Sequence, residues 1–188
     1  MGALAIPRLT VEQYLALDRK AEIPSEFHDG EIFPMVATSW AHSRLVSRVD
    51  RLFQERLDGK PCEVGASSTR VRGGGSRYVY PDLTIVCGHP EFADDHADTL
   101  LNPKVIVEVL SPSTEDYDLG TKSKLYRELP SLEAYVLVSQ TSRSVEVLHR
   151  MPDNRWVIST YDAPRENFVI EPIQIEIPLE DVYAGILD

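Results

Sequence analysis

Two apolar runs, each carrying a single carboxylate, dominate the middle of the chain. The first reads VYPDLTIVC and holds Asp82, and the second reads KVIVEVL and holds Glu108. Continuous runs rich in Val, Ile and Leu, bounded by Pro, Gly, Asn and Ser, are typical of strands buried on both faces. An ionised carboxylate in such a strand is disfavoured by several kcal/mol unless a cation or hydrogen-bond donors meet it. A bound divalent cation is the simplest explanation for both acids.

The segment after the second run predicts a helix from about Asp118 to Leu129. Pro112 and the neighbouring Ser and Thr residues end the preceding strand. Helical spacing puts Lys122 on the inward stripe of this helix, whereas Lys124 points elsewhere and is expected at the surface. Two strand carboxylates and one inward lysine can bind a metal, orient a water and stabilise negative charge. The apolar members of the stripe are Leu119, Leu125, Tyr126 and Leu129.

The pattern before these runs predicts two helices and several strands. A capping-box pattern at Thr10 begins a short helix, VEQYLALDRK, and a longer helix is expected over about 41–57. A polar, turn-like stretch over 22–30 separates them, with a strand over 31–36. Two strands, over about 62–71 and 77–87, are joined by a triple glycine that favours a hairpin turn over a phosphate loop. A solvated loop is expected over 88–102.

The C-terminal third predicts hairpin-like antiparallel strands over 134–139, 144–149 and 156–161, and then short strands and a final helical turn. The order of elements indicates one α/β domain with a mixed sheet flanked by helices, spanning 1–188. Its core is expected over about 10–150, and the short C-terminal strands over 155–188.

Composition narrows the class of protein. No apolar run approaches the ~20 residues of a membrane span, and the N-terminus lacks the pattern of a signal peptide. Cys62 and Cys87 make neither a disulfide framework nor a zinc motif. We therefore expect a cytoplasmic protein.

The net charge of −11 by itself argues against nucleic-acid binding, because phosphate contacts need Lys and Arg. The charge is uneven, however: residues 42–77 carry +4 and the rest −15. Arg44, Arg48 and Arg51 form one stripe of the expected long helix. They are either a solvated face whose stems cover the core edge, which we favour, or contacts for nucleic-acid phosphate.

Several short motifs resemble a known family. Pro81-Asp82 followed by a strand with Glu108 resembles the PD-(D/E)XK nuclease superfamily. More specifically, the chain is similar to the Uma-two family of restriction endonucleases over about residues 10–150. The matching motifs are DGE at 29–31, His42 opening a helix, YPD at 80–82, EVLSPST at 108–114, the D-x3-K-x3-Y of Asp118, Lys122 and Tyr126, and PSLEAYVLVSQ at 130–140.

This resemblance implies a restriction-endonuclease-like fold and Mg²⁺- or Mn²⁺-dependent cleavage of DNA phosphodiester bonds, with a homodimer as the working unit. Asp82, Glu108 and the Val109 carbonyl would hold the metal. The superfamily pattern wants Lys two residues after the strand acid, where Leu110 stands, so Lys122 would take that role. Glu31 could complete the metal shell or bind a second ion. His42 could donate to phosphate or act as an acid or base.

Other interpretations stay open from the sequence. A buried Glu108–Lys122 pair can be purely structural, and Asp82 after proline can cap a turn. His42 can be an ordinary helix-start residue, and Glu31 an exposed strand residue. The whole chain could be a catalytically silent nuclease fold that binds a protein partner through its acidic surface. It could also hydrolyse a different phosphoester.

Overall fold

The computed structural model describes residues 8–35, 37–66, 69–112 and 114–187. Val36, Ser67, Ser68 and Ser113, which fall within predicted elements or motifs, lie outside these ranges. Within the described residues, no helix is long and apolar enough to cross a membrane.

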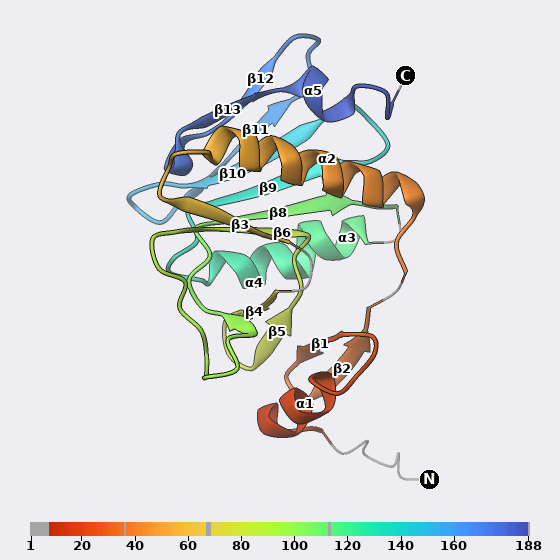
Figure 1. Cartoon of the computed structure of the whole chain (residues 1–188), viewed down its shortest axis with the longest axis vertical. Coiled ribbons are helices and arrows are strands. Elements are labelled where there is room, and N and C mark those ends of the chain that lie inside the picture. The colour runs from red at the N-terminus through yellow and green to blue at the C-terminus, as the bar shows by residue number, and fades with distance from the viewer. Residues whose placement is uncertain (1–7, 36, 67–68, 113, 188) are drawn as a thin grey trace.

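A six-stranded sheet forms the centre of the molecule (Figure 1). Its strand order is β11-β10-β9-β8-β6-β3, with β8 and β9 parallel and the other neighbours antiparallel. The mixed α/β fold expected from the sequence is thereby confirmed, including the antiparallel pairing of the three later strands. The strands are β3 (Cys62–Ala66), β6 (Leu83–Cys87), β8 (Val105–Leu110), β9 (Ala134–Ser139), β10 (Val145–Arg150) and β11 (Trp156–Tyr161).

Helix α2 (Trp40–Leu57) covers one face of this sheet, as Figure 1 shows. The side chain of Ser39 accepts a hydrogen bond from the His42 amide and caps the helix. Its apolar residues Leu45, Val49, Leu52 and Phe53 are buried in the same hydrophobic cluster as the facing strands. The hairpin of β12 (Asn167–Ile170) and β13 (Ile175–Pro178), the 3₁₀ turn η2 (Glu171–Ile173) and α5 (Leu179–Tyr183) complete this hydrophobic layer.

The opposite face carries a helical segment and a second, five-stranded sheet in the order β2-β1-β5-β4-β7. The helical segment consists of α3 (Glu115–Tyr117), a π-helical turn η1 (Asp118–Lys122) and α4 (Ser123–Arg127). Leu119, expected to face inward, is 42% exposed. The π-turn widens the helix at this point, so that Asp118 and Lys122 face the core and Leu119 turns outward.

Two of the predicted long strands are in reality pairs of strands in different sheets. The expected strand over 77–87 divides into β5 (Arg77–Val79) and β6, with Pro81 and Asp82 between them. Proline has no amide hydrogen to donate to a sheet ladder, which explains the break. The expected strand over 62–71 likewise divides into β3 and β4 (Arg70–Arg72). β4 and β5 pair antiparallel, and the predicted hairpin at the triple glycine is confirmed by the Gly73 amide donating to the Arg77 carbonyl at 2.9 Å.

The N-terminal part holds an unexpected strand. Helix α1 (Val11–Asp18) starts at the predicted capping box, but the stretch expected to be a turn contains β1 (Ser25–His28). This strand pairs with β2 (Glu31–Pro34) through a two-residue turn, in which Asp29 and Gly30 have φ of 49° and 103°. Asp-Gly between short strands is the strongest short-range hairpin signal, and it was present in the sequence.

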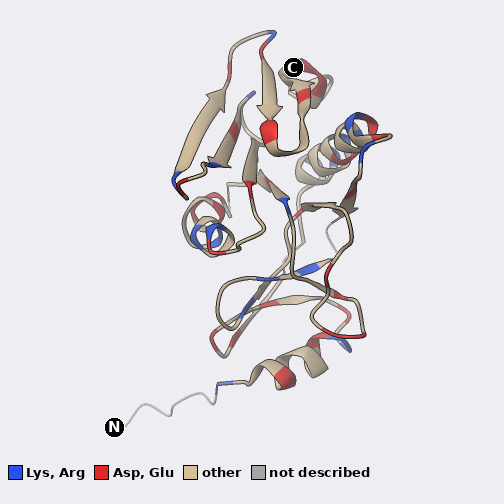
Figure 2. Ribbon diagram, turned by 90° about the vertical axis from the view of Figure 1, so that its left-hand side faces the viewer, with Lys and Arg blue, Asp and Glu red and all other residues tan. Residues whose placement is uncertain are grey.

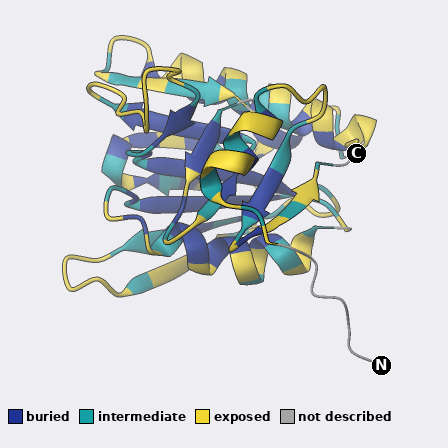
Figure 3. Cartoon of the chain, turned by 90° about the horizontal axis from the view of Figure 1, so that it is seen from below, coloured by how far each residue is buried: buried dark blue, intermediate teal, exposed yellow. Residues whose placement is uncertain are grey.

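The loop over 88–102 is more ordered than expected, since it contains β7 (Thr99–Leu100), which pairs parallel with β4. Asp94 and Asp98 of this loop form ion pairs with Arg19 at 2.6 and 2.7 Å. Figure 3 shows the resulting pattern, with buried central strands and exposed helix faces and loop ends.

A disulfide joins Cys62 and Cys87, which face each other across β3 and β6. The sequence analysis did not predict this pairing, because two distant cysteines carry no spacing signal. Adjacent antiparallel strands bring their side chains together only once the sheet has formed.

Candidate functional site

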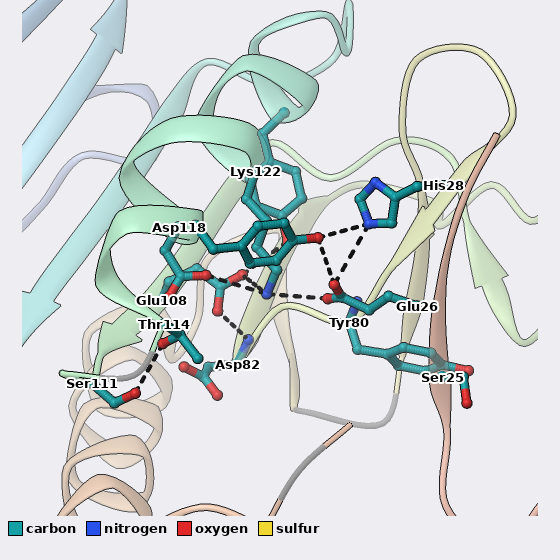
Figure 4. Close-up of polar contacts among 12 residues, drawn as sticks. Ser25, Glu26, His28, Tyr80, Asp82, Glu108, Ser111, Thr114, Asp118 and Lys122 are labelled. Atoms are coloured by element: carbon teal, nitrogen blue, oxygen red, sulfur yellow. Dashed lines mark hydrogen bonds and ion pairs between the residues drawn. The ribbon is translucent and has the colours of Figure 1, made fainter. Parts of the chain in front are cut away.

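A cavity of about 570 Å³ lies where the two sheets meet, between the β1–β2 hairpin, the adjoining ends of β6 and β8, and the π-turn. Figure 4 shows its polar side chains pointing toward one another from these separate elements. Four carboxylates and one lysine line it: Glu26, Asp82, Glu108, Asp118 and Lys122.

Hydrogen bonds between side chains and backbone amides hold Asp82 and Glu108 together. The backbone pairing of β6 with β8 ends at Leu83 and Val107. Beyond that pair, the side chains of Asp82 and Glu108 make the hydrogen bonds that link the two strands. The Asp82 amide donates to Glu108 Oε2 at 3.3 Å, and the Val109 amide donates to Asp82 Oδ2 at 2.8 Å. The two carboxylates are therefore held side by side at the end of two strands.

Glu108 is 3% exposed and faces the helical segment rather than α2. Its Oε1 accepts hydrogen bonds from Lys122 Nζ at 3.0 Å and from the Tyr126 hydroxyl at 2.9 Å. Burial raises the pKa of this carboxyl; Lys122 opposes the shift, and the negative charge of Asp82 adds to it. The pKa is raised overall to about 8 in spite of Lys122, so a further cation would be needed to keep Glu108 ionised at neutral pH.

Lys122 lies inside the cavity, as its helical spacing predicted, with 7% exposure. Three carboxylates surround its Nζ: Glu108 at 3.0 Å, Glu26 at 3.2 Å and Asp118 at 3.5 Å. Burial alone would lower the pKa of the ammonium, but these carboxylates raise it well above its ordinary value. Lys122 is therefore a cation held by anions.

Leu110 occupies the position where the superfamily pattern has lysine, and it is buried in the apolar cluster beneath α4. The lysine of the following helix is the one that reaches Glu108.

Glu26 and His28 belong to the site although the sequence analysis did not single them out. Glu26 accepts hydrogen bonds from the Tyr117 hydroxyl at 2.7 Å and the Tyr80 amide at 3.3 Å, and His28 Nε2 lies 2.7 Å from the Tyr117 hydroxyl. Burial by itself raises the pKa of Glu26, but the contacts with His28, Lys122 and Tyr117 outweigh it and lower that pKa to about 2. The Asp29-Gly30 hairpin signal could have revealed the strand that carries both residues.

His42 reaches the site from the first turn of α2. It is 7% exposed, and its Nε2 lies 3.3 Å from Asp82 Oδ2. Burial lowers the pKa of the imidazole, but Asp82 overcomes that effect, so the pKa is raised overall. His42 and the Val109 amide thus contact the same oxygen of Asp82, its Oδ2.

Asp118 is a further carboxylate that the sequence motif contained but that was not assigned a role. Its Oδ1 is buried without a hydrogen-bond partner among the described residues, apart from the ion contact with Lys122. Burial raises the pKa of this carboxyl.

The structure does not bring Glu31 to the cavity. Its side chain is 62% exposed, and its carboxylate lies 3.9 Å from Arg8. Position along the hairpin explains this outcome: Glu31 pairs with His28 beside the turn and is not part of the cavity lining, whereas Glu26 lies two residues further along β1.

The arginine stripe of α2 lies against the C-terminal segment and not at the cavity. Arg44 and Arg48 donate to the carbonyls of Gly185 and Asp181, and Arg51 pairs with Glu55. The favoured interpretation, that these stems cover the core edge, agrees with this arrangement. Figure 2 shows Lys and Arg interspersed with Asp and Glu rather than gathered into one basic face.

Comparison with known proteins places the chain in a family. The model of the Uma2 family, described as "Putative restriction endonuclease", matches residues 11–180. The chain belongs to the Uma2 family. Two relatives from Synechocystis sp., the uncharacterized proteins slr1290 and sll1609, are 34% and 33% identical to it. The alignments cover 96% and 87% of this chain and 94% and 92% of theirs.

A solved structure has the same fold as this Uma2 chain. The crystal structure of a putative nuclease belonging to DUF820 from Anabaena variabilis aligns with a TM-score of 0.78, over 95% of this chain and 99% of that one. At 16% identity, this likeness concerns the fold.

Proposed function

We propose that this protein is a Mg²⁺-dependent endonuclease that hydrolyses DNA phosphodiester bonds, with Mn²⁺ as a substitute ion. The observation that carries the proposal is the convergence of two strand-end carboxylates, Asp82 and Glu108, with a buried lysine 3.0 Å from Glu108. Buried charges of this kind are costly to maintain, and such clusters in a cavity are typical of functional sites.

The donor set fits a hard divalent cation. Among the described residues, no group of three or more His, Cys, Asp or Glu side chains is arranged to hold a metal. Mg²⁺, however, usually binds through one or two carboxylates and keeps several waters. Asp82, Glu108 and the Val109 carbonyl would supply its protein ligands. When bound, the ion would lower the pKa of a coordinated water and neutralise charge on the phosphate.

The remaining cavity residues would prepare the reaction. Lys122 would orient the attacking water or stabilise the negative charge that develops on the phosphate. His42 would hold Asp82 in place through its 3.3 Å contact with Oδ2. Glu31 has no part in this proposal, because its side chain points away from the cavity.

A plasmid-nicking assay tests the function directly. Wild-type protein with Mg²⁺ should convert supercoiled plasmid to nicked circles, and Lys122→Met should lower that rate by about 10²–10³-fold, the range for losing one charge-stabilising donor. Lys124→Met removes an exposed lysine two residues away and is the matched control. Undiminished nicking by Lys122→Met would refute the assigned role.

A second candidate is a protein-binding module without turnover. The net charge of −11 favours it, because DNA must approach an acidic protein. Absence of nicking with either ion, together with pull-down of a basic protein partner, would support it. Hydrolysis of a small phosphoester but not of plasmid would instead favour the third possibility, a different phosphoesterase.

We also propose that the protein acts as a cytoplasmic homodimer. Among the described strands, β11 pairs with β10 alone, and Val157 and Ile158 on it are 46% and 58% exposed. The strand WVISTY has no charge or proline to protect this edge. A second copy could extend the sheet there, which would give two sites for the two DNA strands.

A further inference from the structure

Glu26 forms a second polar contact for Lys122, independent of Glu108. Its Oε1 lies 3.2 Å from Lys122 Nζ, while its Oε2 accepts the Tyr117 hydroxyl at 2.7 Å (Figure 4). Glu26 is 8% exposed and lines the cavity. Glu26 is therefore fixed in position before anything binds in the cavity.

The two anions that hold Lys122 most closely come from different parts of the fold. Glu108 lies on β8 of the six-stranded sheet, and Glu26 lies on β1 of the five-stranded sheet. A divalent cation on Asp82 and Glu108 would compete with Lys122 for the Glu108 oxygens and would repel the ammonium. Of the two, Glu26 is the anion that such an ion would leave free to hold Lys122.

Asp118 is less suited to this task. It lies on the same π-turn as Lys122, and its carboxylate is 3.5 Å from the ammonium, farther than that of Glu26 at 3.2 Å. Its Oδ1 also lacks the hydrogen bonds that fix Glu26.

We propose that Glu26 is a positioning residue that keeps Lys122 in the cavity when a divalent cation occupies Asp82 and Glu108. Tyr117 and His28 serve the same purpose by fixing the Glu26 carboxylate. This inference rests on the proposed function, because it assumes the metal site. It assigns Glu26 a role that appears only when the ion is present.

The test is the reactivity of the Lys122 amine with an acylating ester, measured by mass spectrometry without DNA and with or without Mg²⁺. In wild type, Lys122 should stay protected in both conditions. In Glu26→Gln, Mg²⁺ should speed acylation of Lys122 at least fivefold, because the amine then lacks the Glu26 carboxylate that holds it inside the cavity and becomes accessible to the ester. With Mg²⁺, Lys122 of Glu26→Asp should be acylated more slowly than that of Glu26→Gln and faster than that of wild type.

Controls separate this role from simple misfolding. Glu63→Gln removes an exposed carboxylate on β3 and should leave Lys122 protected. If Glu26→Gln does not fold, Tyr117→Phe removes one hydrogen bond to Glu26 and should give a smaller effect in the same direction. In nicking assays, Glu26→Gln should lower kcat while the KM for DNA stays the same.

Two outcomes would overturn the inference. One is equal protection of Lys122 in Glu26→Gln and wild type with Mg²⁺. The other is equally fast acylation of the variant without Mg²⁺, since Glu26 would then have only a structural role. Isothermal titration of Mg²⁺ into the same proteins separates these outcomes from a failure of the proposed function. Equal protection despite Mg²⁺ binding overturns this inference, whereas absence of Mg²⁺ binding and of wild-type nicking overturns the proposed function.

Discussion

Glu108 Oε1 lies 3.0 Å from Lys122 Nζ, although 14 residues separate them along the chain. The contact joins the middle of the central sheet to the π-turn that follows it. Because both groups are buried, each favours the charged form of the other.

Loss of the Lys122 ammonium group should destabilise the fold. Lys122→Met should lower the free energy of unfolding by about 3–5 kcal/mol, because Glu108 and Glu26 would remain buried without their cation. The double variant Lys122→Met/Glu108→Gln should lose less than the sum of the two single variants. Urea denaturation followed by circular dichroism measures all three. Strict additivity would mean that the pair is not coupled.

Metal binding should depend on both strand-end acids. Isothermal titration of Mg²⁺ should give binding heat in wild type and in Glu63→Gln, and none in Asp82→Asn or Glu108→Gln. The amides remove one ligand charge while keeping the side-chain volume. The titration should be repeated with a DNA duplex, since substrate phosphate can complete a Mg²⁺ site. No binding even with DNA would contradict the proposed ligand set.

Acid should weaken the fold through Glu26. Its pKa of about 2 in the folded protein lies below its ordinary value of 4.5, so its ionised form favours folding. This contribution, about 3 kcal/mol from the size of the shift, is present above pH 4.5 and is lost as the pH falls toward 2. The stability difference between wild type and Glu26→Gln should therefore shrink over that interval. A difference that stays constant from pH 5 to pH 2 would argue against an ionised Glu26.

Reduction of the Cys62–Cys87 disulfide should lower stability without changing nicking. The bond closes a loop with a sequence separation of 25 and should contribute about 3 kcal/mol. Cys87 lies at the end of β6 opposite to Asp82, so reduction of the disulfide should leave the nicking rate unchanged. Melting temperatures with and without dithiothreitol measure the effect, and the Cys62→Ser/Cys87→Ser variant should match the reduced protein. A fall in nicking on reduction would contradict this separation.

The β11 edge should determine the oligomeric state. Ile158→Lys places a charge on the exposed edge and should shift a wild-type dimer to monomer in sedimentation-velocity runs. Leu17→Lys, at a residue 54% exposed against 58% for Ile158, is the matched control on α1. A dimer that survives Ile158→Lys would place the interface elsewhere.

The sequence by itself determined the elements whose signals are local. Apolar runs gave the central strands, the capping residues gave α1 and α2, and helical spacing placed Lys122 inward. The free-energy cost of burying Asp82 and Glu108 identified them as candidate site residues. That cost can be read from the residue type and its immediate neighbours in the sequence.

Only the tertiary structure decided which distant residues meet. Glu26 lies 82 residues before Glu108 and reaches Lys122 because β1 pairs with β5, a contact with no local signal. The disulfide between β3 and β6 is also a contact between distant residues that no local pattern predicts. So are the hydrogen bonds that Arg44 and Arg48 of α2 donate to C-terminal carbonyls. The positions of Glu31 and Leu119 were predicted wrongly because they depend on packing and not on the periodicity of the chain. The hairpin turn determines where Glu31 lies, and the π-helical turn determines the direction of Leu119.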